Sequence, residues 1–195
     1  MDTGNRMLLA DKLKLLCIGT VLALLSFVPA VGGLVSLVGG VISIIAIAKL
    51  SPLDEGYKKA LGAVIAGIIC AVLVVFAAGV GAVSAVGGSG AGLGIAAILI
   101  LALSIATMVF SLMEAYFVCN TTSQQLLIVD CSDEAALGEM TWKARLAAFV
   151  VAVIATLLGS FLSISLLSTV STIVTALANA LFAWFLYKAY TALQA

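Results

Sequence analysis

The chain has no histidine, and it has almost no charge over three long stretches. Residues 15–48 and 146–187 contain no Asp, Glu, Lys or Arg, and residues 60–129 contain only Glu114. The lack of histidine removes the commonest metal ligand and the commonest general base. A net charge of zero gives no support to a nucleic-acid surface. The sequence therefore predicts no metal, no cofactor and no nucleic-acid partner.

Composition favours the membrane class. Hydrophobic residues make up 64% of the 195 residues and charged residues 9%, whereas charged residues are about 25% of an ordinary soluble domain. A helix needs about 20 apolar residues to cross a hydrocarbon core of about 30 Å, and each uncharged stretch is long enough to cross and return. A β-barrel strand would alternate apolar and polar residues over about 10 positions, but the runs here are continuous. We therefore predict an all-α integral membrane protein.

Turn residues divide each uncharged stretch into two helices. Pro29 followed by paired glycines divides the first stretch, the glycine-rich segment 79–94 divides the second, and Gly159 lies at the division of the third. The polar segment 120–142 is predicted as the longest loop, with a short interfacial helix in it. We expect one domain over 1–195, a compact bundle of six transmembrane helices at about 12–29, 31–50, 58–80, 92–118, 143–160 and 164–190. Segment 12–50 makes either two full crossings or a re-entrant hairpin.

Charge also predicts the orientation of this bundle. All nine Lys and Arg residues fall on one side of the six-pass topology, and the positive-inside rule makes that side cytoplasmic. An even number of crossings then places both termini in the cytoplasm. We expect a bacterial cytoplasmic membrane, with the lipid bilayer as the main environment. A homo-oligomer or other membrane subunits are the protein partners that this class allows.

Small residues at helical spacing predict where the helices touch, because lipid provides no hydrophobic drive between helices and close packing takes its place. Three of the predicted helices carry such faces. The helix-packing residues expected from this spacing are Gly32, Ser36, Gly40, Ala63, Gly67, Ala148, Ala152 and Gly159.

Two helices carry polar stripes, in which residues three or four apart lie on one helix face. On helix 92–118 the stripe is Ser104, Thr107, Ser111 and Glu114, and on helix 164–190 it is Ser165, Ser168, Thr172, Thr175 and Asn179. The stripes either bond to each other as a seam or line a polar path. Glu114 is the one Asp, Glu, Lys or Arg residue in the three long stretches. A carboxylate within the membrane is a candidate functional group.

Three functions remain open from the sequence. The first is a small transporter or channel subunit, with a polar path between the fourth and sixth helices. The second is a non-catalytic accessory or assembly subunit that docks other membrane helices. The third and least favoured is an intramembrane enzyme. No second buried acid, GxSxG motif or Ser–Lys pair at membrane depth accompanies Glu114, so we predict no catalytic residues and no enzyme.

Overall fold

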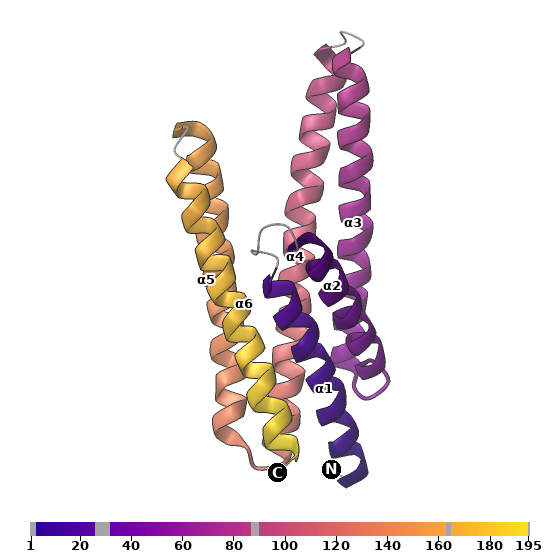
Figure 1. Cartoon of the computed structure of the whole chain (residues 1–195), viewed down its shortest axis with the longest axis vertical. Helices are drawn as coiled ribbons and strands as arrows, with labels where there is room; N and C mark the ends of the chain where they lie inside the picture. Colours follow the sequence, from indigo (N-terminus) through magenta and orange to yellow (C-terminus); the bar gives the residue numbers. More distant parts are fainter. Residues whose placement is uncertain (1–2, 26–31, 87–89, 163–164, 195) are drawn as a thin grey trace. The chain divides into compact units, whose positions relative to one another are not determined.

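The computed structural model describes residues 3–25, 32–86, 90–162 and 165–194, and within these ranges the chain is helical with short turns and no strand (Figure 1). The helices follow one another as three hairpins. They are α1 (Thr3–Leu24), α2 (Gly32–Leu50), α3 (Glu55–Val86), α4 (Gly90–Ile128), α5 (Ser132–Leu162) and α6 (Ser165–Gln194).

Four of the six helices are long and apolar enough to cross a membrane. The apolar spans are Gly33–Leu50, Glu55–Val83, Gly94–Ile128 and Thr169–Gln194. α1 and α5 instead carry charged residues in their first halves, such as Lys12 and Glu139. These spans indicate that the chain is embedded in a membrane. The number of crossings and the side of the termini stay predictions.

The chain divides into two compact bodies, each described here by itself. The first body comprises Met1–Leu61 and Ala115–Ala195, and it holds α1, α2, the start of α3, the end of α4, α5 and α6. The second body, Gly62–Glu114, holds the remainder of α3 and α4.

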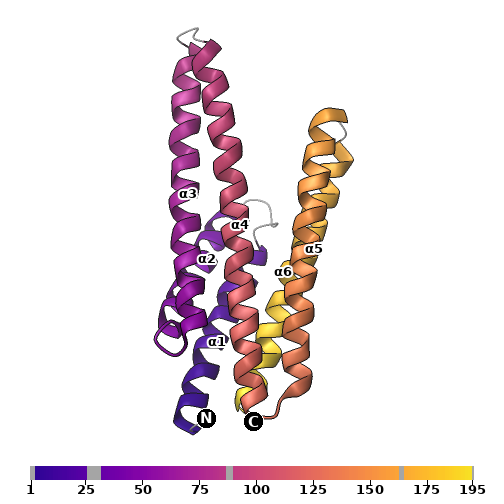
Figure 2. The same cartoon turned by 180° about the vertical axis from the view of Figure 1, so that it is seen from behind.

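In the first body, α1 packs against both α2 and α6, and α6 packs in turn against α5. The antiparallel pair α5 and α6 lies side by side in both views (Figure 2). Leucines of α1 and aromatic residues of α6 supply much of the buried interior. Fully buried side chains in these two helices include Leu9, Leu13, Leu16, Phe185 and Leu186. Close packing of these side chains stabilises the contact between the helices.

The backbones of α1 and α2 come closest at two glycines. A Cβ atom at Gly39 would lie 2.7 Å from both the Gly19 carbonyl oxygen and the Ala23 backbone nitrogen. Only glycine fits at such a backbone contact. At Gly40, which the sequence analysis named as a packing residue, a Cβ atom would meet nothing within 4 Å. The close contact between these helices is therefore at Gly39 and not at the predicted position, Gly40.

Two small-residue contacts join the helices of the second body. A Cβ atom at Gly67 of α3 would lie 3.5 Å from the Phe110 Cβ of α4, and one at Gly81 would lie 3.1 Å from the Ala96 Cβ. Gly67 was among the expected packing residues, and Gly81 was not.

The predicted long loop over 120–142 is wrong. α4 continues to Ile128 and α5 begins at Ser132, so a turn of three residues joins them. The Cys131 N–H donates to the Leu126 carbonyl over 3.0 Å, and the Asp130 N–H donates to the Leu127 carbonyl over 3.3 Å. Asp130 has a φ of 60°. This is the Schellman arrangement that ends a helix, with Asp130 in the left-handed position.

The glycine-rich segment 79–94 is also more helical than expected, because α3 reaches Val86 and α4 starts at Gly90. In an apolar environment a helix is the local structure that satisfies every backbone group, so the propensity cost of glycine is overridden. Residues 87–89 between them lie outside the described residues. The turns predicted near 29–33 and 159–164 fall partly on the undescribed residues 26–31 and 163–164, but α2 already begins at Gly32 and α5 continues through Gly159 to Leu162.

Candidate functional site

The polar stripe of α4 lies in the second body. Ser104 and Thr107 are half-buried, Ser111 is exposed and Glu114 is half-buried. The Thr107 hydroxyl donates to the Leu103 carbonyl over 2.9 Å. A hydroxyl bonded to its own helix in this way can face lipid, protein or water at little cost.

The polar stripe of α6 lies in the first body. Thr172 and Thr175 are exposed, and the Thr175 hydroxyl donates to the Ser171 carbonyl over 2.8 Å. The side chains of Ser165 and Ser168 lie outside those described. The two stripes thus belong to different bodies, and a path or seam between them stays a prediction.

Asn179, at the end of the α6 stripe, binds a charged side chain of α5. The Arg145 guanidinium donates to Asn179 Oδ1 over 2.6 Å and lies 4.5 Å from the centroid of the Phe182 ring. Both residues are half-buried. An arginine held by an amide and by an aromatic face is fixed in position. The spacing along α6 predicted Asn179 as a stripe residue, whereas Arg145 counted only among the positive charges of the cytoplasmic side.

The start of α3 is tied to the end of α4 by buried polar contacts. Asp54 caps α3, because its Oδ1 accepts from the Gly56 N–H over 2.8 Å, and its Oδ2 accepts from Gln125 Nε2 over 3.0 Å. The hydroxyls of Tyr57 and Thr122 lie 2.9 Å apart, and both side chains are fully buried. These partners explain why residues 121–125 form a helix rather than a loop.

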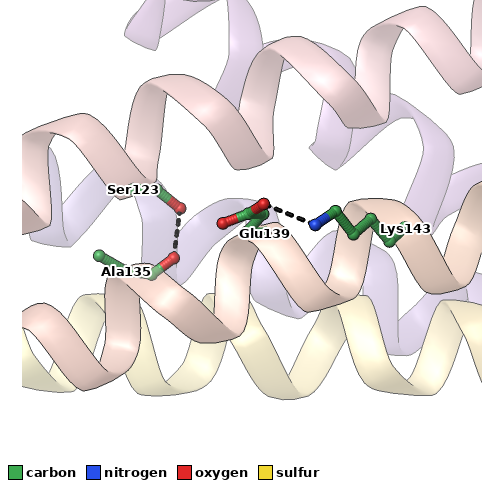
Figure 3. A network of polar contacts seen from close by, with 4 residues as sticks. All are labelled: Ser123, Ala135, Glu139 and Lys143. Carbon is green, nitrogen blue, oxygen red and sulfur yellow. Dashed lines mark hydrogen bonds and ion pairs between the residues drawn. The ribbon is translucent and has the colours of Figure 1, made fainter.

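The end of α4 is tied to the start of α5 in a similar way (Figure 3). The Ser123 hydroxyl donates to the Ala135 carbonyl over 2.9 Å. Gly138 lies against the Ser123 hydroxyl and the Phe185 ring, so a side chain at 138 would displace one of them. These contacts hold the two helices at a fixed distance.

A groove runs between the end of α4 and the start of α5, with a volume of about 500 Å³. We call it the α4–α5 groove, and its polar and aromatic lining is Tyr116, Asn120, Ser123, Gln124, Glu139 and Trp142. Tyr116 and Trp142 meet edge to face, with ring centroids 4.8 Å apart.

Glu139, which lines this groove, forms an ion pair with Lys143 one helical turn further along α5, with Nζ and Oε1 2.6 Å apart (Figure 3). The hydrogen bond and the positive charge of Lys143 hold the pKa of the Glu139 carboxyl below its usual range. The carboxylate is therefore ionised at neutral pH. From the sequence, Glu139 was only one of the charges that separate two apolar stretches, and the polar residues 120–124 were assigned to a loop.

The remaining packing residues of the sequence analysis lie as follows. Ala63, Ala148 and Ala152 are buried, and Ser36 is half-buried. Gly32 begins α2, and Gly159 lies in α5, but both fall outside the residues whose surroundings are described.

All four cysteines are free thiols, and Cys17 donates to the Ala183 carbonyl with a sulfur–oxygen distance of 3.5 Å. Within the described ranges, no three His, Cys, Asp or Glu side chains gather as a metal site.

No family model, curated protein or solved structure matches this chain. Its function is therefore inferred from the side chains themselves.

Proposed function

We propose that the chain is a non-catalytic, six-pass protein of the bacterial cytoplasmic membrane, with both termini inside, and that it acts as a transporter or channel subunit. The α6 stripe lines the proposed polar path, and the Arg145–Asn179 pair stands at its cytoplasmic end. Glu114, in the second body, is the candidate ionisable group of the α4 stripe.

The exposed α6 stripe carries this proposal. Of its described residues, Thr172 and Thr175 are exposed and Asn179 is half-buried. A stripe of hydroxyls beside an oriented guanidinium–amide pair presents both donors and acceptors to a solute. The Thr175 hydroxyl donates a hydrogen bond to the Ser171 carbonyl, so it is not left without a hydrogen-bond partner when no solute is present.

Flux through reconstituted vesicles tests the transport proposal. The purified chain is assayed for uptake of K⁺, Na⁺, Cl⁻ and glycerol, and then compared with Thr175→Val, which keeps the side-chain shape and removes the hydroxyl. Thr20→Val is the matched control, because the Thr20 hydroxyl also bonds its own helix, at the Leu16 carbonyl over 2.9 Å. We expect lower flux for Thr175→Val and no change for Thr20→Val. Equal flux for all three proteins contradicts the proposal.

Orientation is tested separately by cysteine labelling in a cysteine-free background. Ser89→Cys, in the predicted external turn, should react with a membrane-impermeant reagent in intact cells. Ser132→Cys, at the start of α5, should react only after permeabilisation. Labelling of Ser132→Cys from outside contradicts the proposed orientation.

An accessory subunit is the second candidate, and one surface favours it. A shallow apolar groove of about 330 Å³ between α5 and α6 is lined by valine, leucine and four alanines, which are Ala144, Ala147, Ala148 and Ala178. Small residues allow a further helix to approach closely. In this case Ala147→Leu should weaken association with the partner subunit, and the wild-type chain alone should show no flux for any probe.

A further inference from the structure

The α4–α5 groove lies toward the C-terminal end of α4, where the length of this helix predicts the depth of lipid headgroups. α4 has 39 residues, which gives a length of about 58 Å, whereas a hydrocarbon core is about 30 Å thick. The surplus falls at the polar C-terminal end, where Asn120, Ser123 and Gln124 lie. The edge-to-face pair of Tyr116 and Trp142 is typical of residues placed at the membrane–water interface. This placement requires only that α4 is embedded in the membrane, and it is independent of transport.

The groove and the ion pair beside it have the chemistry of a zwitterion site. Glu139, which lines the groove, supplies a carboxylate, and Lys143, one helical turn further along α5, supplies an ammonium 2.6 Å from it. The Ser123 hydroxyl donates its hydrogen bond to the Ala135 carbonyl, so its oxygen can still accept a hydrogen bond from a ligand in the groove. The amides of Asn120 and Gln124 add both donors and acceptors. A ligand with one positive and one negative group a few ångströms apart complements this arrangement, because its positive group can pair with Glu139 and its negative group with Lys143.

We infer that the α4–α5 groove binds the headgroup of an aminophospholipid, a primary ammonium joined by two carbons to a phosphate. The ammonium is held by Glu139 and the neighbouring side-chain oxygens, and the phosphate is held by Lys143 and an amide N–H. A volume of about 500 Å³ suits a small headgroup. The acyl chains leave past Tyr116 and Trp142 toward the hydrocarbon.

The same groove discriminates against other common headgroups. A carboxylate and side-chain oxygens need N–H donors, which a primary ammonium has and a quaternary choline group lacks. A headgroup with only negative charge has no cation of its own to pair with the Glu139 carboxylate. Preference for the primary amine is therefore the property to measure.

Lipid retention measured by native mass spectrometry tests this inference. The full chain is equilibrated in bicelles with equal amounts of phosphatidylethanolamine, phosphatidylcholine and phosphatidylglycerol, and the retained lipids are counted. We expect phosphatidylethanolamine to exceed phosphatidylcholine by about tenfold, as one charge-assisted hydrogen bond would give. Glu139→Gln should abolish this preference. Equal retention of the two lipids by the wild-type chain overturns the inference.

Glu55→Gln is the matched control, because Glu55 and Lys59 form a second exposed ion pair four residues apart, at 3.2 Å, on α3. It should keep the full preference. If Glu139→Gln and Glu55→Gln behave alike, Glu139 does not hold the headgroup. Both glutamates are exposed, so both variants should fold, and thermal melting followed by circular dichroism checks this.

A competition arm distinguishes a lipid from a soluble ligand of the same chemistry. Trp184→Phe leaves Trp142 as the single tryptophan, and its fluorescence reports on the groove. Soluble phosphoethanolamine is added at millimolar concentration to the detergent-solubilised protein. A saturable change shows that the headgroup alone is recognised. No change, together with retained phosphatidylethanolamine, shows that the lipid is the ligand and that its chains contribute. No change and no lipid preference overturn the inference.

Discussion

Arg145 of α5 donates to Asn179 of α6 over 2.6 Å, and this hydrogen bond joins a cation to the end of an exposed polar stripe. The guanidinium also lies over the Phe182 ring, so its position is set from α6 on two sides. Hydrogen bonds to charged groups contribute about 1.5–3 kcal/mol, more than the average of about 0.6 kcal/mol for hydrogen bonds between membrane helices.

Asn179→Ala should therefore lower the free energy of unfolding by about 1–2 kcal/mol, because it removes an acceptor from a half-buried cation. Denaturant unfolding in detergent, followed by circular dichroism, measures the change. Asn5→Ala, at an exposed position of α1, serves as control and should have no effect beyond about 0.5 kcal/mol. Equal stability of the two variants would show that the Arg145–Asn179 bond contributes little.

The crossing of α1 and α2 predicts opposite effects for adjacent glycines. Gly39→Ala would bring a methyl group to 2.7 Å from backbone atoms of α1, and such overpacking costs about 1–3 kcal/mol. Gly40→Ala meets open space and should be neutral or stabilising by up to about 1 kcal/mol, because alanine favours a helix. Thermal melting in detergent compares them. A Gly39→Ala protein as stable as Gly40→Ala would contradict this crossing.

The Tyr57–Thr122 pair predicts a non-additive double mutant. Tyr57→Phe or Thr122→Val alone leaves one fully buried hydroxyl without its partner, at a cost of about 1–3 kcal/mol. The double variant removes both hydroxyls and should lose less stability than the two single variants together. Unfolding free energies of the four proteins complete the cycle. Strict additivity would mean that the two hydroxyls do not interact.

These relationships show where sequence reasoning succeeds and where it stops. Long uncharged stretches require apolar helices, so the all-helical, membrane-embedded character was predictable. The helical ends of α4 and α5 were not, because Ser123 and Gln125 look like loop residues until their partners at Ala135 and Asp54 are known.

The packing and the site show the same limit. A spacing of four residues identified a small-residue face on α2, but the contact lies at Gly39 rather than Gly40, because the crossing angle of two helices is a tertiary property. The spacing along α6 was enough to include Asn179 in the stripe. The bond from Arg145 to Asn179 could not be predicted, because it depends on how α5 packs against α6.

The proposed polar path predicts that water reaches the α6 stripe and not the neighbouring apolar face. Thr175 and Ile173 are both exposed on α6, with Ile173 53% exposed, but only Thr175 belongs to the stripe. In a cysteine-free background, Thr175→Cys and Ile173→Cys are reconstituted in vesicles and treated with a charged, water-soluble thiol reagent. The proposal predicts rapid modification of Thr175→Cys and little modification of Ile173→Cys, because lipid excludes the reagent. Equal rates at the two positions, or no reaction at either, would contradict a water-accessible path along α6.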